Sequence, residues 1–405
     1  MNLKEFFNSE LVQLPRGGFD ETSETFEQFL NSLFDRYLGE LQKIDGTQFP
    51  EITTALADTA DLARELSDTI AKSAGMYLSG HPHSAYNELE HVLSKFDWSP
   101  FRSQLGESTS SFSLSDPFSP YLYSVLYPPL YRIRADRSEF KIPSRGDIFH
   151  VPFEKRRLVN NQRYSIAGLP CLYLGSSIWI CWEELGRPAL DSIWVSRFRI
   201  VKPVNVLDFQ FAPHHVWTLF EALTGGTPNA SDRSSEAKLK ERFNQEFLKS
   251  YLVCWPLLAA CSIRPQSRSG SFVPEYVVPQ LLLQWVAQEG RVDGIRYFSA
   301  RMPSKGNHIL AHSNCVFPVK TNLVKGHCTE LKKAFALTEP LSWEVLTATN
   351  LGSPRVVTNR SSNAFAPVQM SDDILLQYSQ TAFFDVEMQL EQIEGTKDYS
   401  RVINP

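Results

Sequence analysis

The sequence predicts an α+β protein in which an N-terminal helical domain precedes a domain of mixed β-sheets with flanking helices. Over roughly the first hundred residues, apolar side chains recur three to four positions apart, as they do on one face of a helix. Beyond a Ser- and Pro-rich segment, apolar residues occur instead in short runs separated by turn residues, which is typical of strands. A chain of 405 residues is long enough for both parts.

Three apolar stripes predict three N-terminal helices. The first stripe runs from Phe26 to Leu41 and has Thr22 or Ser23 placed to cap it. The second begins at Leu56 and is expected to break near Gly75, and the third ends at Phe96. Packed together, the three helices would bury these faces.

These patterns divide the chain into a helical domain (1–110), a linker (111–127), a second domain (128–320) and a C-terminal extension (321–405). The linker is the Ser- and Pro-rich segment. A Gly-, Ser- and Asn-rich loop followed by a charged helical stretch predicts an insertion at about 210–250. The extension either completes the core of the second domain or forms a further module.

Within the second domain the expected elements follow from short segments. Strands are predicted for "LYRIRA" (130–135), "CLYLG" (171–175), "SIWVSRFRIV" (192–201), "VNVLDF" (204–209) and "DGIRYFSAR" (293–301). Helices are predicted for "SSIWICWEEL" (176–185) and "VPQLLLQWVAQEG" (278–290), the latter with Pro279 near its first turn and Gly290 after its end. Alternation of apolar and polar residues from Phe384 to Leu390 predicts a late half-buried strand.

Composition excludes several classes of function. A net charge of -5 gives no basic footprint, so we expect no binding of nucleic acid by the protein itself. The first residues lack a signal-peptide pattern, and no apolar run approaches the length of about 20 residues that crosses a bilayer, so we expect a cytoplasmic protein without a membrane partner. The six cysteines form no CxxC pair and are expected to be reduced core thiols.

Several motifs of known chemistry are absent from the sequence. It contains no Gly-rich phosphate loop, no HExxH and no GxSxG. A group of histidines and cysteines near the end of the second domain has ligand types that suit zinc, but its spacing fits no common closed site, and we expect no metal there. The group consists of His308, His312, Cys315, His327 and Cys328.

Arginines and an acid pair remain as candidates for chemistry. Arg132 and Arg134 lie two residues apart in a predicted strand, on one face, where a guanidinium needs an anionic partner. Glu183 and Glu184 are adjacent on a predicted helix and therefore point about 100° apart, so only one of them can face a given cleft. Arginines and glutamates of this kind more often form structural ion pairs than ligand sites. A functional assignment therefore has to rest on the order and spacing of all the candidate residues together.

That order resembles the RES family, which contains the toxins of RES-Xre toxin-antitoxin modules and longer relatives. The matching pieces are "LYRIRA", then "RYSIAGLPCLYLGSSIWICWEEL", then "VPQLLLQWVAQEGRVDGIRYFSAR" followed by "GNH". The resemblance implies a fold similar to that of ADP-ribosyltransferases. It also implies cleavage of the nicotinamide-ribose bond of NAD by hydrolysis or phosphorolysis, with NAD as substrate and no cofactor required.

By position, the resemblance makes Arg132, Glu184 and Ser299 the catalytic residues. Glu184 would hold the ribose hydroxyls and stabilise an oxocarbenium-like state, and Ser299 would bind the ribose or orient Glu184. Arg134 and Glu183 are near-duplicates, so either assignment could slip. Arg132 and Arg163 would grip the pyrophosphate, and Tyr173 would stack on the nicotinamide or adenine ring. The expected substrate-binding residues are Arg134, Arg163, Tyr164, Tyr173, Tyr297 and Arg301.

The resemblance also implies a biological setting. The enzyme would act as a growth-arresting toxin or an abortive phage-defence effector, restrained by an Xre-type or other antitoxin protein. Assembly into a homo-oligomer is a further possibility. The N-terminal region resembles the HEPN-like domains of some RES proteins but lacks their R-x4-6-H ribonuclease motif. It would mediate assembly, sense a trigger or cover the cleft. Two alternatives remain: a protein ADP-ribosyltransferase, and an inactive RES-like module that binds a nucleotide or a protein.

Overall fold

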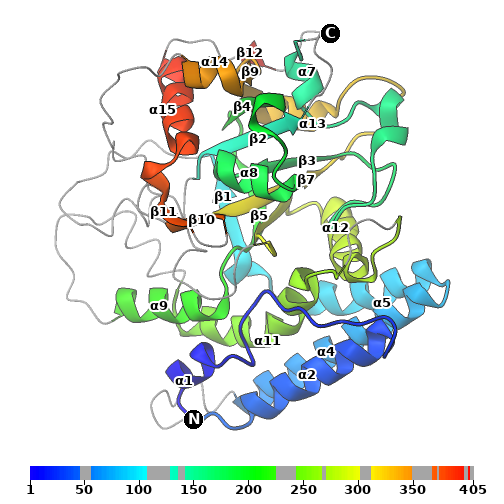
Figure 1. Ribbon diagram of the computed structural model, residues 1–405. Helices are drawn as coiled ribbons and strands as arrows, with labels where there is room; N and C mark the ends of the chain where they lie inside the picture. The colour runs from blue at the N-terminus through cyan, green and yellow to red at the C-terminus, as the bar shows by residue number, and fades with distance from the viewer. Residues whose placement is uncertain are drawn as a thin grey trace.

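The computed structural model has the predicted α+β architecture. It describes residues 1–45, 56–106, 128–135, 142–224, 243–266, 271–301, 312–348, 367–371, 374–395 and 400–401. Helices from the N-terminal region lie together at one end of the molecule, and a large mixed sheet with further helices forms the rest (Figure 1). The predicted linker 111–127 lies outside the described residues, and the domain limits stay a prediction.

The N-terminal helices are α1 (Leu3–Asn8), α2 (Phe26–Leu41), α4 (Leu56–Leu78) and α5 (Pro82–Lys95). The cap of α2 is Thr25 rather than Thr22 or Ser23, and its side chain accepts a hydrogen bond from the backbone N–H of Gln28. Helix α4 continues through Gly75, where a break was expected. A Cβ at this position would lie 1.9 Å from Oε2 of Glu27, so the end of the Glu27 side chain of α2 lies directly against Gly75.

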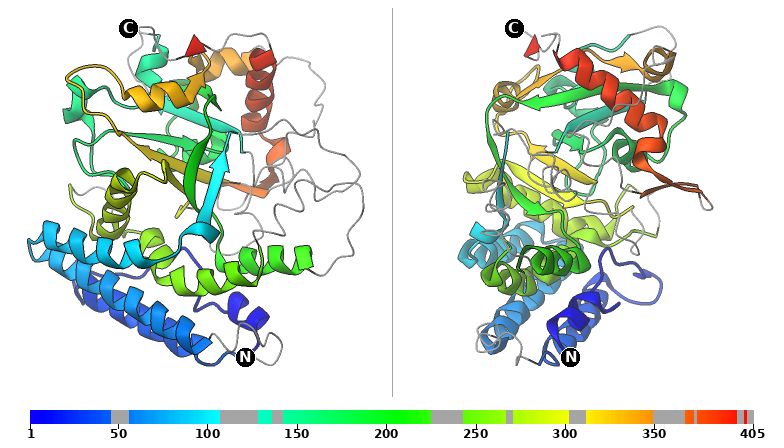
Figure 2. Two further views of the ribbon diagram at one scale, coloured as in Figure 1. Left: turned by 180° about the vertical axis from the view of Figure 1, so that it is seen from behind. Right: turned by 90° about the vertical axis from the view of Figure 1, so that its left-hand side faces the viewer.

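These helices pack on α11 (Gln245–Ser262), which is largely buried from Phe247 onward. Residues 225–242 of the predicted insertion, including the start of its charged stretch, lie outside the described residues. The ring of Tyr37 stacks on Trp255 at 4.0 Å between centroids, and its hydroxyl donates to the carbonyl oxygen of Leu252. Trp255 in turn donates through Nε1 to the carbonyl oxygen of Val12. In both views of Figure 2 the blue N-terminal helices lie along the yellow-green α11. The N-terminal region and α11 therefore share one apolar core.

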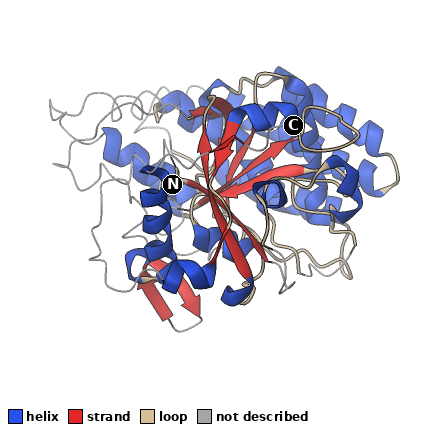
Figure 3. Cartoon of the chain, turned by 90° about the horizontal axis from the view of Figure 1, so that it is seen from above, coloured by secondary structure: helices blue, strands red, loops and turns tan. Residues whose placement is uncertain are grey.

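Among the described residues, the main sheet has ten strands in the order β1-β5-β6-β7-β3-β2-β4-β8-β12, with β9 paired to β4. Strands β5 and β6 are parallel, and the other described pairs are antiparallel. Seen from above, the strands fan out with the usual twist of a sheet (Figure 3). The strands are β1 (Arg102–Leu105), β2 (Leu130–Ala135), β3 (Cys171–Gly175), β4 (Ile193–Ile200), β5 (Val204–Phe209), β6 (Gly294–Phe298), β7 (Ser313–Pro318), β8 (Phe335–Leu337), β9 (Leu341–Ser342) and β12 (Ser400–Arg401).

Alternating residues of the strands contribute to two separate apolar clusters. In β3, Leu172 and Leu174 belong to the smaller cluster, whereas Cys171 belongs to the larger one that includes the N-terminal helices. The remaining α-helices surround these clusters: α7 (Arg145–Ile148), α8 (Ile178–Glu184), α9 (Pro213–Thr224), α12 (Val277–Glu289), α13 (Thr329–Ala334), α14 (Trp343–Ala348) and α15 (Ala382–Gly395).

One prediction for the C-terminal part of the chain, a late strand, is wrong. The expected late strand at Phe384 to Leu390 is part of helix α15, and the preceding hairpin is formed by β10 (Pro367–Ser371) and β11 (Ile374–Gln377). Buried Phe383, Phe384, Glu387 and Leu390 recur at helical spacing, and the apparent alternation was a coincidence of composition.

All six cysteines are buried and free, as predicted. Within the residues that the structure describes, no helix combines the length and the apolar character needed to cross a membrane.

Candidate active site

A cavity of about 310 Å³ opens where β2, β3 and α8 meet, a volume at the lower end of the range for ligand pockets. Strands β2 and β3 are paired through a single residue pair, Tyr131 with Gly175, so they separate beside the cavity. The cavity brings together segments that lie far apart in the sequence. Its lining residues are Arg132, Ile133, Asn161, Gln162, Arg163, Tyr173, Leu174, Gly175, Cys181, Glu184, Leu185, Val273, Tyr276, Tyr297, Ala300, Arg301 and Asn314.

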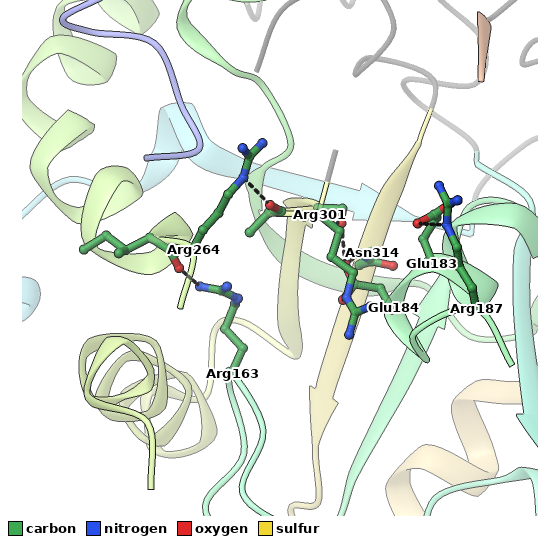
Figure 4. Close-up of polar contacts among 10 residues, drawn as sticks. Arg163, Glu183, Glu184, Arg187, Arg264, Arg301 and Asn314 are labelled. Carbon is green, nitrogen blue, oxygen red and sulfur yellow. Dashed lines mark hydrogen bonds and ion pairs between the residues drawn. The ribbon is translucent and has the colours of Figure 1, made fainter. Parts of the chain in front are cut away.

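Glu184 presents its carboxylate to this cavity from the last turn of α8. Its Oε1 accepts hydrogen bonds from the hydroxyl of Ser299 at 2.5 Å and from Nδ2 of Asn314 at 3.0 Å. Nε of Arg301 lies 3.6 Å from its Oε2 (Figure 4). Ser299 is fully buried, so of its two expected roles the contact fits the orientation of Glu184.

The structure separates Glu183 from Glu184. The side chain of Glu183 is only 10% exposed and forms an ion pair with Arg187, whereas that of Glu184 is 35% exposed. Figure 4 shows the two carboxylates directed to different partners, as their spacing on a helix requires. Glu183 is therefore structural in this geometry, and Glu184 is the carboxylate available to a ligand.

The two arginines of β2 are separated in the same way. Arg132 lines the cavity, and its Nη1 donates to the carbonyl oxygen of Tyr173 at 3.2 Å across the gap between β2 and β3. Burial lowers the pKa of Arg132 to about 10, so the guanidinium remains a cation at neutral pH. Arg134 is exposed, and its Nη1 donates to the carbonyl oxygen of Asp147 outside the cavity lining.

Arg163 lines the cavity, but part of its guanidinium is already engaged. Nη1 donates to the carbonyl oxygens of Cys261 and Ile263 at the end of α11, at 3.0 and 2.9 Å. The guanidinium also lies over the ring of Tyr276 at 5.2 Å. Arg163 thus fixes one wall of the cavity and borders the ligand space at the same time.

The expected tyrosines differ in their access to the cavity. Tyr173 and Tyr297 line it, and Tyr164 lies behind Tyr297 with 4.6 Å between ring centroids. The hydroxyl of Tyr173 shares a hydrogen bond of 2.9 Å with Ser165. Burial raises the pKa of all three phenols well above its ordinary value, so they are neutral donors and ring surfaces rather than bases.

Close packing positions α8 over the end of β3. A Cβ on Gly175 would lie 2.6 Å from both Sγ of Cys181 and Cγ2 of Ile180, so this glycine admits the helix. Burial raises the pKa of Cys181 to about 12, and this thiol in the cavity wall is therefore a poor nucleophile.

The first turn of α8 is held by two side chains. Oγ of Ser177 accepts from the backbone N–H of Ile180, and Oε1 of Glu387 accepts from that of Ile178 at 2.6 Å. Glu387 also accepts from the hydroxyl of Tyr378 at 2.6 Å. Two of the N–H groups that a helix start leaves without intrahelical partners are thereby satisfied.

Glu387 gives the stability of the fold an expected pH dependence. Burial, as the largest cause, raises its pKa from 4.5 to about 8; Glu391 raises it further, whereas Tyr378, the backbone of Ile178 and Arg197 oppose the shift. The folded state therefore binds this proton more tightly than the unfolded chain. The stabilisation of the folded state by protonated Glu387 is complete below about pH 4.5 and is lost as the pH rises to about 8.

We expect the Glu387→Gln variant to lose less stability than the wild type between about pH 5 and about pH 9, because it has no carboxyl to ionise. Urea unfolding at both pH values measures the difference. An identical pH dependence in the two proteins would contradict the assignment.

The histidine and cysteine group does not form a metal centre in the described part of the chain, where no three His, Cys, Asp or Glu side chains gather around a common point. His312 shares a hydrogen bond with Ser177, and the ring of His327 packs against that of His150. His308 lies outside the described residues.

Sequence reasoning missed four polar or aromatic residues of the cavity. Asn314 stands in the apolar strand β7, and its pairing with Glu184 spans 130 residues. Asn161 and Gln162 belong to a loop that Gln280 of α12 holds by donating to Asn161 at 2.5 Å and to the carbonyl oxygen of Gln162 at 2.9 Å. Asn161 and Gln162 directly precede Arg163 in the sequence, and this proximity was the only signal for them. No signal pointed to Tyr276.

The chain is similar to a known protein. The chain is 28% identical over 338 residues to the protein named "Putative toxin YopC" of Bacillus subtilis (strain 168). The aligned region covers 82% of this chain and 68% of that protein. No family model and no solved structure matches the chain.

Proposed function

We propose that this protein is an NAD-cleaving enzyme of the RES type that acts as a growth-arresting toxin or abortive phage-defence effector. The observation that carries the proposal is the placement of Glu184. Its carboxylate is oriented by Ser299 and Asn314 at one side of a cavity that also presents arginine and tyrosine side chains. The name of the relative supports a toxin, and the family resemblance supports NAD as the substrate.

The chemistry of the bond suits this set of residues. When the bond between ribose C1′ and the nicotinamide nitrogen breaks, the electron pair stays with the departing ring, which becomes neutral nicotinamide. No general acid is therefore required. Positive charge develops on the ribose, and the fixed carboxylate of Glu184 stabilises it. An acceptor oxygen of water or phosphate then bonds to C1′ and releases its proton.

Cationic side chains provide the complementary part of the site. Arg132 and Arg301 line the cavity on different elements and offer planar donors to a pyrophosphate. Tyr173, Tyr297 and Tyr276 supply ring surfaces for a base or for nicotinamide. A cell that makes such an enzyme has to restrain it, and we include an antitoxin protein in the proposal.

The paired arginines of β2 offer a matched test. We expect Arg132→Met to lower kcat/KM for NAD about 10- to 100-fold, the effect of losing a charge-assisted hydrogen bond to a phosphate. Arg134→Met should stay close to the wild type, because Arg134 lies outside the cavity lining. Nicotinamide release measured over a range of NAD concentrations gives both values. Equal effects of the two substitutions would contradict the proposed binding mode.

A further inference from the structure

The C-terminal segment contacts both ends of the helix that carries Glu184. This segment comprises the hairpin β10–β11 and helix α15, and α15 lies beside α8. It is separated from α8 by about half the length of the chain. Nothing in the proposed chemistry uses it, which raises the question of what its contacts with α8 achieve.

At the start of α8, the contact is made by a buried carboxyl group. Glu387 of α15 accepts a hydrogen bond from the first helical N–H, that of Ile178, and is held in place by the hydroxyl of Tyr378. The ring of Tyr378 packs edge-on against His312, which shares a hydrogen bond with Ser177, the N-cap of α8. The first turn is thus attached to the C-terminal segment through side chains and not only through apolar packing.

At the end of α8, the contact is made by Arg187. Its Nε donates to both carboxylate oxygens of Glu183, at 3.0 and 3.1 Å, and its Nη1 and Nη2 donate to the carbonyl oxygens of Met370 and Gln369 in β10. Arg187 has a φ of 58°, which is uncommon for a residue with a Cβ, and these bonds hold it there. Figure 4 shows Arg187 joined to Glu183, on the side of α8 away from Glu184.

Between these two ends the helix has only seven residues, which is too short to be stable by itself. The aromatic ring of Trp182 adds a contact to Phe383 of α15, with 5.3 Å between centroids. The position and rotation of such a short helix are therefore set by the contacts at its two ends. Because Glu184 meets Ser299 and Asn314 at hydrogen-bond distance, a rotation of α8 about its axis would move the carboxylate out of reach of both.

We propose that residues 367–395 act as a clamp on α8, with Glu387 and Arg187 as positioning residues that fix the direction of Glu184. This inference deepens the proposed function and rests on it for its catalytic part. Clamping itself is a structural property and can be measured without substrate. A misplacement of a reacting group by about 1 Å lowers rates by about 100-fold, which sets the expected scale.

The experiment uses the full-length chain with three variants at the clamp. Glu387→Leu removes the acceptor for Ile178, whereas Glu387→Gln keeps an acceptor of the same shape. Arg187→Lys keeps the charge opposite Glu183 but lacks the planar fork that reaches β10. Glu344→Leu, on an exposed position of α14, is the control within the C-terminal part of the chain. Each protein is assayed for kcat and KM of nicotinamide release and for amide hydrogen exchange of residues 176–187.

We expect Glu387→Leu to lose about 100-fold in kcat with KM for NAD changed less than about threefold, since the arginines that bind NAD remain in place. Glu387→Gln should restore most of kcat, Arg187→Lys should lie between, and Glu344→Leu should match the wild type. Exchange at 176–187 should rise at least about tenfold in Glu387→Leu, while exchange in the central strands stays unchanged.

Wild-type kcat together with unchanged exchange at 176–187 in Glu387→Leu or Arg187→Lys would overturn the clamp. If Glu387→Leu does not fold, Arg187→Lys provides the test: lowered kcat with faster exchange at 176–187 supports the clamp, and wild-type kcat with unchanged exchange overturns it. A wild type that does not cleave NAD refutes the proposed function, and the exchange data then decide the clamp alone: faster exchange in the variants supports it and equal exchange overturns it.

Discussion

Replacing Glu184 by glutamine is expected to lower the rate of NAD cleavage about a thousandfold while leaving NAD binding within about threefold of the wild type. Glutamine can still accept hydrogen bonds from Ser299 and Asn314, so the geometry of the site is preserved. It lacks the negative charge that stabilises the developing oxocarbenium ion, and loss of one preorganised electrostatic group costs about 10²- to 10³-fold or more. The effect should therefore appear in kcat and not in KM.

Two measurements check this result: kcat for nicotinamide release, and the Kd of the variant for NAD by calorimetry. Glu344→Gln, at an exposed position on α14, is the matched control and should retain full activity. A Glu184→Gln variant that keeps more than about a tenth of the wild-type kcat would remove Glu184 from the mechanism.

The second large effect concerns the N-terminal helices. We expect a chain without residues 1–95 to fail to fold, because the face of α11 that Tyr37 and the helix α4 cover would be exposed to water. A milder form of the same change is Tyr37→Ala, which removes the stacking on Trp255 and the bond to the carbonyl oxygen of Leu252. It should reduce the free energy of unfolding by about 3–5 kcal/mol.

Urea denaturation of the full-length variant measures this loss. Phe272→Ala is a suitable control, because Phe272 is 47% exposed and should contribute much less. A truncated chain that is monomeric, folded and active would show that the helices are a detachable regulator. The contacts favour a structural role for them, and a trigger or antitoxin that acts through them would have to act through α11 as well.

Much of the architecture could be predicted from the sequence because local patterns determine it. The strand at "CLYLG", the helix that ends before Gly290 and the helix from Phe26 to Leu41 each show a strong period, a cap or a stop signal. The late helix α15 was misread since its composition satisfies a period of two as well as one of 3.6 residues.

The candidate site could be predicted in part, for a different reason. Arg132, Tyr173 and Glu184 were identified through the order of motifs in a resemblance, and the structure places all three around one cavity. Asn314 and Glu387 carry no local signal. Their partners are 130 and 209 residues away, and only the pairing of β7 with β3 and the packing of α15 on α8 bring them into contact.

The choice between near-duplicate residues also depended on three-dimensional contacts. A helix places Glu183 and Glu184 on different sides but does not say which side faces a cleft. Arg187 binds Glu183 whereas Glu184 lines the cavity, and Arg187 does so from a backbone conformation that a sequence pattern does not reveal.

The most direct test of the account is the release of nicotinamide by the purified full-length protein from NAD labelled in its adenosine part, with and without phosphate. We predict rapid release in the wild type, with the label recovered in a small product: ADP-ribose if water is the acceptor, its 1″-phosphate if phosphate is required. Label attached to protein would instead favour ADP-ribosylation. No release of nicotinamide under any of these conditions would contradict the proposal that this cavity cleaves NAD.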